Sequence, residues 1–205
     1  NLQSLSGPNF DYIVLHGVYS WVNAKTRDNI GAFIASRLKD GGIVYLSYDS
    51  LPGWSAITPL RDMVVAYTKN MSGDSVAKTR AGLDFLEFLK ANKAAFFEDN
   101  PTAVAFLEQI KDLPLDYVTH EFYGDSVQPA YFENVARDMQ SAGLVFSGSA
   151  IPHLNFIDLA VPSEFHDLLK NSSTRLEFET YGDFIRNQRF RRDVFIKSED
   201  SMSEQ

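Results

Sequence analysis

Aromatic and polar side chains gather at two points of the sequence, and each point directly follows a run of apolar residues. His16, Tyr19 and Trp21 stand at the first point, and Tyr48 and Asp49 stand at the second. Histidine titrates near neutral pH and can take a proton from an amine or a hydroxyl group, while aromatic faces attract a cationic ligand such as a sulfonium ion. These residue types suit a group transfer that depends on alignment and exclusion of water, without a metal or a protein nucleophile.

The same residues also have structural interpretations. Tyr19 and Trp21 would equally serve as packing at the start of a helix, and His16 as a strand-end histidine hydrogen-bonded to the backbone. The other three histidines lie far apart in the sequence, which favours surface or packing roles; they are His120, His153 and His166.

Residue spacing excludes several other chemistries. The sequence has no cysteine, so it has no thiol nucleophile and no cysteine-ligated metal. His120-Glu121 begins like a zinc-binding helix motif but lacks the second histidine, so no metal site is expected. Ser55 and Ser126 follow glycines at the spacing of a nucleophile elbow, but neither has the closing glycine. None of the 12 glycines stands two positions from another, which leaves neither a dinucleotide-binding turn nor a P-loop.

Both points follow segments that we expect to be buried strands. Residues 10–17 and 43–48 are nearly continuous apolar runs, which is typical of a parallel sheet covered on both faces. Between them, residues 26–38 carry apolar residues at helical spacing, and Gly41-Gly42 is expected to end that helix. The pattern predicts a right-handed βαβ unit in a Rossmann-like sheet. Ligands bind outside the carboxyl ends of such strands, so both points would line one crevice.

After residue 54 the pattern becomes mostly helical. We divide the chain into residues 1–54, which form half of an α/β sheet, and residues 55–197, a mostly helical region. This region begins with a helical insertion over roughly residues 55–128. Residues 198–205 are polar without an apolar anchor, which predicts a disordered tail. Two late strands are expected in the helical region, at residues 144–149 and 156–161.

Two side-chain clusters are expected to be structural. The arginines from Arg186 to Arg192 are interpreted as a solvated helix face that pairs with nearby carboxylates. The large apolar residues from Phe85 to Leu89 are interpreted as helix core.

Composition restricts the partners. Lys and Arg number 19 against 27 Asp and Glu, and the net charge of −8 would repel a phosphate backbone, so no nucleic acid partner is expected. No apolar run approaches the roughly 18 to 20 residues of a membrane span, so no membrane partner is expected. The absence of cysteine and of a signal-peptide pattern favours a cytoplasmic protein. The sequence begins at Asn1 without an initiator Met, which indicates either processing or a piece of a longer chain.

Several motifs resemble a known family. Residues 10–22 and 38–48 resemble the fourth and fifth strands of a class I S-adenosylmethionine-dependent methyltransferase. Asp49-Ser50-Leu51-Pro52-Gly53-Trp54 is similar to a signature of bacterial methyltransferases that carry the predicted methyltransferase regulatory domain, some of which are protein-lysine methyltransferases. Three further segments resemble the regulatory domain itself: His120-Glu121-Phe122, Tyr131-Phe132-Glu133 and the run from Tyr181 to Arg191.

The resemblance implies a C-terminal portion of such an enzyme, with a partial class I methyltransferase sheet followed by a mostly helical subdomain. His16 and Tyr19 would then be catalytic residues near the transferred methyl group. S-adenosylmethionine would contact His16, Gly17 and Trp21. The substrate pocket would be lined by Tyr48, Asp49 and Trp54.

Two departures from the family pattern affect what the resemblance implies. Asp49 stands where the family usually has asparagine, which places a carboxylate at the crevice. The glycine-rich turn that holds the methionine moiety of the cofactor, and the acidic residue for its ribose, would lie upstream of Asn1.

The sequence therefore supports two hypotheses. One is a methyltransferase that acts on a protein or small-molecule acceptor; the other is a non-catalytic regulatory or protein-interaction module derived from a methyltransferase. A dehydrogenase or epimerase is disfavoured because its glycine turn is absent. In the methyltransferase strand order, the strand at residues 10–15 would have an unpaired apolar edge, which predicts association through this edge or with a missing N-terminal half.

Overall fold

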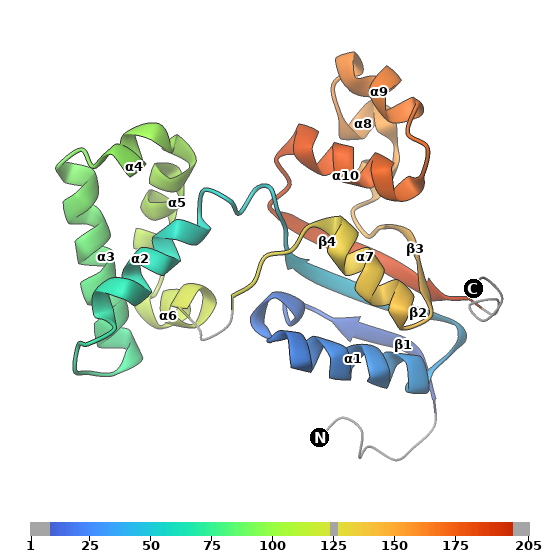
Figure 1. Cartoon of the computed structure of the whole chain (residues 1–205), viewed down its shortest axis with the longest axis horizontal. Helices are drawn as coiled ribbons and strands as arrows, with labels where there is room; N and C mark the ends of the chain where they lie inside the picture. Colours follow the sequence, from blue (N-terminus) through green and yellow to red (C-terminus); the bar gives the residue numbers. More distant parts are fainter. Residues whose placement is uncertain (1–8, 124–126, 199–205) are drawn as a thin grey trace. The chain divides into compact units, whose positions relative to one another are not determined.

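The computed structural model describes residues 9–123 and 127–198, which belong to two compact units (Figure 1). We call residues 1–52 and 128–205 the sheet unit, and residues 53–127 the helical unit. The helical unit spans residues 53–127, where the sequence analysis expected a helical insertion over roughly residues 55–128. Residues 128–197, however, were expected to continue the helical region, and they belong to the sheet unit because two of their segments pair with the sheet. Of the expected tail, only Ser198 lies among the described residues.

Four strands form one mixed sheet in the order β1-β2-β4-β3. β1 is parallel to β2, and β4 is antiparallel to both of its neighbours, β2 and β3. The helix α1 (Ala24–Arg37) joins the parallel pair, so the expected α/β architecture is confirmed. The strands span Phe10–Leu15 (β1), Leu38–Asp49 (β2), Leu144–Ser149 (β3) and Phe190–Lys197 (β4).

The boundary between α1 and β2 differs from the sequence-based expectation. Leu38 already has an extended backbone, so Gly41 and Gly42 lie inside β2 and do not end the helix. Gly41 has a φ of +73°, a conformation that glycine adopts without a steric penalty. It lies where the β1–β2 register is irregular, between the pairs that Phe10 and Tyr12 make with β2.

The strand expected at residues 156–161 is absent, and the prediction was wrong. This segment forms the single helical turn α8 (Ile157–Ala160), in which the N–H groups of Leu159 and Ala160 donate to the Phe156 carbonyl at 2.9 Å. The side chains of Phe156 and Leu159 are 61% and 67% exposed. The apolar run that suggested a strand is therefore not a buried run. Two further helices follow, α9 (His166–Lys170) and α10 (Arg175–Arg186).

The strand β4 was not expected from the sequence. Its residues alternate between the two faces of the sheet, and the buried face carries Arg191 and Asp193 together with Phe195. Charged residues at two of three buried positions conceal the apolar alternation by which strands are recognised.

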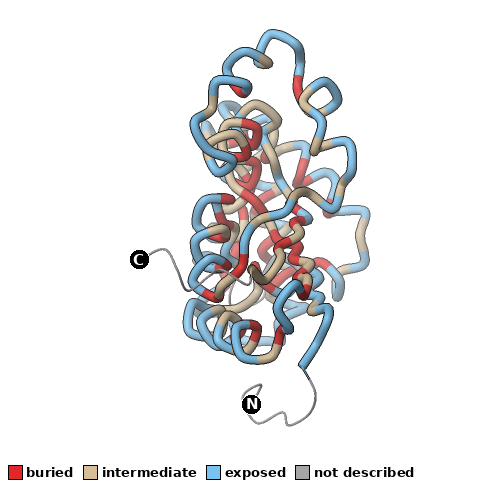
Figure 2. The backbone as a smooth tube through the Cα atoms, turned by 90° about the vertical axis from the view of Figure 1, so that its right-hand side faces the viewer, coloured by how far each residue is buried: buried red, intermediate tan, exposed pale blue. Residues whose placement is uncertain are grey.

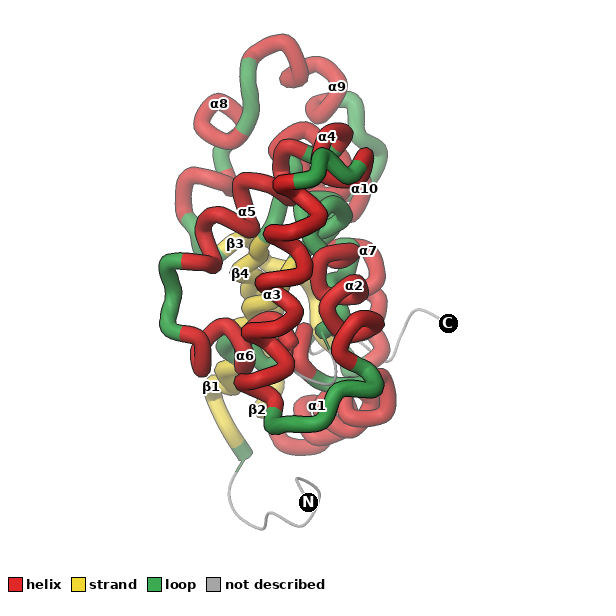
Figure 3. Tube along the Cα trace, turned by 90° about the vertical axis from the view of Figure 1, so that its left-hand side faces the viewer, coloured by secondary structure: helices red, strands yellow, loops and turns green. Residues whose placement is uncertain are grey.

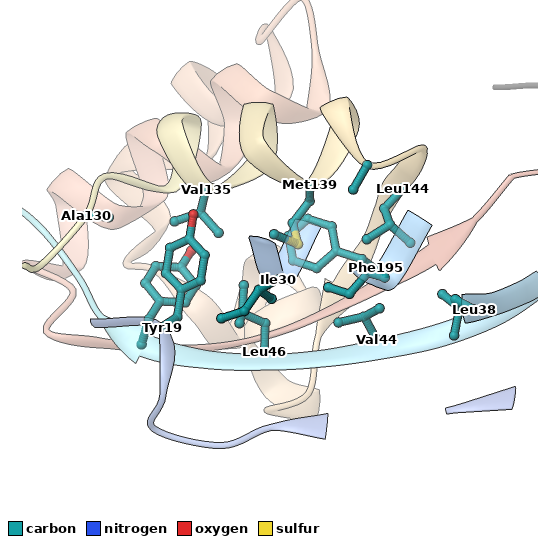
Figure 4. Close-up of a cluster of buried hydrophobic side chains, with 13 residues drawn as sticks. Tyr19, Ile30, Leu38, Val44, Leu46, Ala130, Val135, Met139, Leu144 and Phe195 are labelled. Atoms are coloured by element: carbon teal, nitrogen blue, oxygen red, sulfur yellow. The ribbon is translucent and has the colours of Figure 1, made fainter. Parts of the chain in front are cut away.

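Helices α1 and α7 (Phe132–Ser141) cover one face of the sheet (Figure 1) and enclose the core of the sheet unit, whose side chains Figure 4 shows. Val44 and Leu46 of β2 contribute to this core, together with Val135 and Met139 of α7. Figure 2 shows how buried and exposed residues are distributed along the backbone. On β1, Tyr12 and Val14 alternate with the core-facing Ile13 and are 69% and 65% exposed.

Five helices make up the described part of the helical unit, and Figure 3 shows them. Gly82 of α3 lies directly against Val64 of α2, which allows these two helices to approach closely. Leu86 is buried in this unit, whereas Phe88 is 63% exposed, so the core interpretation holds for only part of that apolar run. Among the described residues, no helix has both the length and the apolar character needed to cross a membrane. The helices are α2 (Thr58–Thr68), α3 (Ser75–Ala91), α4 (Ala95–Asp99), α5 (Pro101–Lys111) and α6 (Leu115–Tyr123).

Candidate functional site

The carboxyl ends of β1 and β2 lie side by side. Leu15 pairs with Leu46 in the parallel register, and one residue further on His16 Nδ1 lies 3.2 Å from Ser47 Oγ. The expected juxtaposition of the two strand ends is therefore present. What each end offers to a ligand depends on which side chains point away from the core.

His16 is the expected site residue that is most accessible. Its side chain is exposed, and its ring stacks on Tyr45 with the ring centroids 6.1 Å apart. Gly17 follows with a φ of +65°, and its N–H donates to Ser47 Oγ at 2.8 Å. A Cβ atom at Gly17 would meet no atom within 4 Å, so the backbone at this turn is open to close approach. His16 and Gly17 thus form an accessible corner at the end of β1.

Tyr19 is buried and does not face the strand ends as a reactive group. Its hydroxyl donates to Asp138 on α7, and the Arg27 guanidinium lies 4.5 Å from the centroid of its ring. Burial, reinforced by the hydrogen bond to Asp138, raises the pKa of Tyr19 well above its usual value. Tyr19 therefore stays a neutral phenol that packs and hydrogen-bonds in the interior, and its expected catalytic role stays a prediction.

Tyr48 is also part of the interior. It lies on the core face of β2, fully buried, and donates its hydroxyl to Asp193 Oδ2 at 2.8 Å. Burial raises the pKa of Tyr48 well above its usual value, with the Asp193 carboxylate adding to the shift. Successive side chains of a strand point to opposite faces, so Tyr48 and Asp49 do not line the same surface. Of these two expected pocket residues, Asp49 is the half-buried one.

The tryptophans are placed differently from each other. Trp21 is half-buried in the short turn Tyr19–Trp21, next to the end of β1. Trp54 belongs to the helical unit, where it is buried and meets Phe106 edge-on at a centroid distance of 5.9 Å. Trp54 is thus a core residue of that unit.

The strand ends are held together by polar residues that the sequence analysis did not single out. Ser20 Oγ accepts the Asp49 N–H at 2.7 Å, and the Gln128 N–H donates to the Ser20 carbonyl at 2.8 Å. Arg27 donates to the carbonyls of Tyr19 and Gln128 at 3.0 and 2.9 Å. These hydrogen bonds join residues that are far apart in the sequence. Neither the spacing nor the types of these residues predict the contacts.

A buried ionic cluster lies next to the end of β2. Arg191 donates to Glu179, Asp183 and Asp193 at 2.9, 2.6 and 2.8 Å, and its guanidinium lies 4.1 Å from the Phe132 ring centroid. The arginines were expected to be solvated, and for Arg191 this was wrong because three carboxylates and an aromatic ring compensate its burial. Asp183 Oδ2 is buried and has no hydrogen-bond partner within the described part of the chain. Burial raises the pKa of Asp183 to about 6.

Two cavities of the sheet unit lie on the side covered by helices. One, of about 250 Å³, lies between α7, β3 and the start of α10, and the other, of about 330 Å³, lies between α1 and α7. Neither is lined by His16 or Asp49. Within the described ranges, no three His, Cys, Asp or Glu side chains come together as a metal site. The candidate site is therefore the open corner around His16, and neither of these two cavities belongs to it.

Sequence and structure comparisons show which proteins this chain is similar to. Residues 114–197, which include α7, β3, α10 and β4, match the family model of the predicted methyltransferase regulatory domain. The resemblance recognised in the sequence is thereby confirmed. A curated relative, the uncharacterized protein sll1526 of Synechocystis, is 37% identical over 93% of this chain and 38% of its own length. The uncharacterized protein RP789 of Rickettsia prowazekii is 29% identical over 89% of this chain and 33% of its own length.

Among solved structures, the chain is similar to PKMT2 of Rickettsia typhi, a protein lysine methyltransferase. The TM-score is 0.76 with 27% identity, over 96% of this chain and 37% of PKMT2. PKMT2 in complex with AdoHcy gives a TM-score of 0.74 with 28% identity, over 92% of this chain and 36% of that chain. The four-stranded sheet thus fits a partial class I methyltransferase fold, as expected. The chain spans about a third of the length of these proteins, from 33% to 38%.

Proposed function

We propose that this chain is part of an S-adenosylmethionine-dependent methyltransferase that acts on protein side chains. The similarity to PKMT2 over nearly the whole chain carries the proposal. The exposed His16 at the end of β1, beside the end of β2, supplies the position at which ligands bind in open α/β sheets.

The accessible residues at the strand ends fit one end of the cofactor. When bound, S-adenosylmethionine supplies a methyl group on a positively charged sulfur. His16 and Trp21 stand beside this position, and the open backbone at Gly17 leaves room for close approach. The Gly17 N–H is already engaged by Ser47, so it is not offered to the ligand. We propose that the turn for the methionine moiety lies upstream of Asn1, because the sequence contains no glycine-rich turn.

The chemistry asks little of the chain beyond alignment. The acceptor ammonium would first lose a proton to solvent; the lone pair of the neutral amine would then form the new N–C bond while the S–C bond breaks, and the electron pair of that bond would stay on sulfur. Holding the two partners in line and excluding water supplies most of the acceleration available to such a transfer. We place His16 beside the reacting groups. Tyr19 does not contact them, and it contributes to packing in the interior.

One observation favours the alternative of a non-catalytic interaction module. Two of the expected site residues, Tyr19 and Tyr48, are buried and bonded to carboxylates, so the strand ends present fewer side chains than expected. A module without catalytic activity would keep the buried tyrosines for packing and would not require a reactive side chain at the strand ends.

A methyl-transfer assay that compares three forms of the protein distinguishes a methyltransferase from a non-catalytic interaction module. We would incubate a bacterial protein extract with S-adenosylmethionine labelled in its methyl group, using this chain, a form extended upstream to the length of its relatives, and the extended form with His16→Ala. We expect labelled protein with the extended form and at least about tenfold less with His16→Ala. Failure of the extended form to transfer label or to bind S-adenosylhomocysteine in calorimetry would support the non-catalytic module.

We also propose that the outer edge of β1 is covered by further polypeptide in the complete protein. β1 is the edge strand of the described sheet, so the N–H and C=O groups along its outer side pair with no described strand. Its Tyr12 and Val14 side chains are exposed on the face opposite the core. Such an edge pairs readily with another chain. Light scattering should therefore show self-association of this chain that Val14→Lys reduces, and a strictly monomeric chain at high concentration would contradict the proposal.

A further inference from the structure

The Ser47 hydroxyl is a buried group with two neighbours at the end of β1. Ser47 is fully buried on β2, and its Oγ lies 2.8 Å from the Gly17 nitrogen and 3.2 Å from His16 Nδ1. The Gly17 N–H donates to this oxygen and occupies one of its lone pairs.

The hydroxyl proton decides the direction of the second hydrogen bond. A buried hydroxyl that donates to nothing costs free energy, so the Ser47 proton needs an acceptor. His16 Nδ1 is the acceptor within hydrogen-bond distance among the contacts of the described chain. A neutral imidazole that accepts at Nδ1 carries its own proton on Nε2. The buried serine therefore selects one tautomer of His16.

The orientation of the ring is fixed as well. The Tyr45 ring stacks on the imidazole at an angle of 28°, and Tyr45 and Ser47 both belong to β2, two residues apart. Because Nδ1 faces the buried serine, Nε2 lies on the other side of the ring of this exposed residue.

We propose that Ser47 is a positioning residue that holds His16 as an Nε2–H hydrogen-bond donor. His16 then binds an oxygen atom of the cofactor or acceptor, such as a carboxylate, carbonyl or hydroxyl oxygen, and does not remove a proton. The identity of that ligand rests on the proposed methyltransferase function; the tautomer does not. This assignment replaces the general-base role considered from the sequence alone.

The first test measures the tautomer without any ligand. Long-range proton–nitrogen NMR spectra of the chain labelled with ¹⁵N-histidine, recorded at a pH where imidazole is neutral, distinguish Nε2–H from Nδ1–H. The His16→Gln variant identifies the His16 signals by their loss. We expect the Nε2–H form in the unchanged chain, and a shift of the tautomer ratio by about fivefold in Ser47→Ala, which corresponds to one hydrogen bond of about 1 kcal/mol.

Ser47→Thr is the matched control, because it keeps the hydroxyl and should keep the original ratio. Far-UV circular dichroism confirms that each variant is folded. A His16 protonated on Nδ1, or a ratio that is the same in Ser47→Ala and the unchanged chain, would overturn the assignment.

The second test distinguishes a donor from a base in the extended, active form. Glutamine offers an N–H donor but does not titrate, so His16→Gln should lower kcat/KM about threefold and keep the pH profile, while His16→Ala should lower it about tenfold or more. Equal losses in both variants, together with a changed pH profile, would identify a base and overturn the donor role. If the extended form shows no methyl transfer, the proposed function fails, while the NMR result still decides the role of Ser47.

Discussion

The hydroxyl of Tyr48 donates to Asp193 Oδ2 across 2.8 Å, and this bond joins the end of β2 to β4 inside the sheet unit. Arg191 donates to both oxygens of the same carboxylate, at 2.8 and 3.0 Å. Arg191 also bonds Glu179 and Asp183 of α10. A continuous set of hydrogen bonds therefore connects α10, within the matched regulatory region, to the strand end that lies beside His16.

Replacing Arg191 should destabilise the sheet unit strongly. Arg191→Met keeps much of the side-chain volume but leaves three buried carboxylates without their shared cation. Removing one partner of a buried ionic cluster costs about 3–5 kcal/mol because the remaining charges stay desolvated. Urea unfolding followed by circular dichroism measures the loss.

Arg192→Met is the matched control for this prediction. Arg192 is adjacent in sequence but exposed, so the change in unfolding free energy should stay within about 0.5 kcal/mol. Similar losses in the two variants would show that the cluster around Arg191 contributes nothing special to stability.

Asp183 should make stability depend on pH in a direction unusual for a carboxylate. Its pKa is about 6 in the folded chain, because burial disfavours the charged form, against an ordinary value of 3.8. Between these values the folded state binds more protons than the unfolded state, so this group lowers stability as pH rises from about 4 to about 6. The contribution is on the order of 1–3 kcal/mol.

Asp183→Asn removes this titration and isolates it from the other carboxylates. The unfolding free energies of the original chain and the variant, measured in urea from pH 4 to 7, should differ progressively in favour of the variant as pH rises. A difference that stays constant over this range, or that favours the original chain at higher pH, would contradict the assignment.

The elements whose buried faces appear in the sequence as a regular spacing of apolar residues were predictable. The parallel pair β1–β2 and the position of His16 follow from two apolar runs separated by an amphipathic helix. The facing of individual residues at the strand ends did not follow, because both Tyr48 and Asp49 were assigned to the crevice although neighbouring strand residues point to opposite faces.

Long-range compensation of charge was not predictable. Arg191 and Asp193 look like surface residues in the sequence. The carboxylates of α10 compensate the burial of Arg191, and Arg191 together with the Tyr48 hydroxyl compensates the burial of Asp193. Tyr19 is a similar case, since its partner Asp138 lies 119 residues away. No local pattern encodes such pairs, so both the strand β4 and the interior role of Tyr19 were missed.

Tyr19→Phe tests the interior role of Tyr19. The variant keeps the ring under Arg27 and loses the hydrogen bond to Asp138, which is exposed and can be hydrated instead. We expect a loss of about 1 kcal/mol in unfolding free energy. Methyl transfer by the extended form should change less than about threefold, because a buried phenol does not contact the acceptor. A loss of about a hundredfold in kcat with unchanged stability would restore Tyr19 as a catalytic residue.

Two glycines in helices should respond in opposite directions to the same substitution. In the helix interior, alanine is favoured over glycine by roughly 1 kcal/mol, so Gly→Ala stabilises wherever the added methyl group finds space. At Gly31 of α1 the new Cβ would meet Ala142 Cβ at 3.9 Å, an ordinary contact, and Gly31→Ala should stabilise the chain by about 0.5–1 kcal/mol. At Gly82 the new Cβ would lie 2.3 Å from Val64 Cγ1 and 3.0 Å from Val64 Cβ, so α2 and α3 must separate.

Gly82→Ala should therefore destabilise the helical unit by about 1–3 kcal/mol, since overpacking outweighs the gain in helix propensity. The double variant Gly82→Ala with Val64→Ala relieves the contact, and it should be more stable than the sum of the two single losses implies. Urea unfolding of the three variants and of Gly31→Ala measures these differences. Strict additivity of Gly82→Ala and Val64→Ala would show that the two residues do not press against each other, and that the close approach of α2 and α3 does not depend on Gly82.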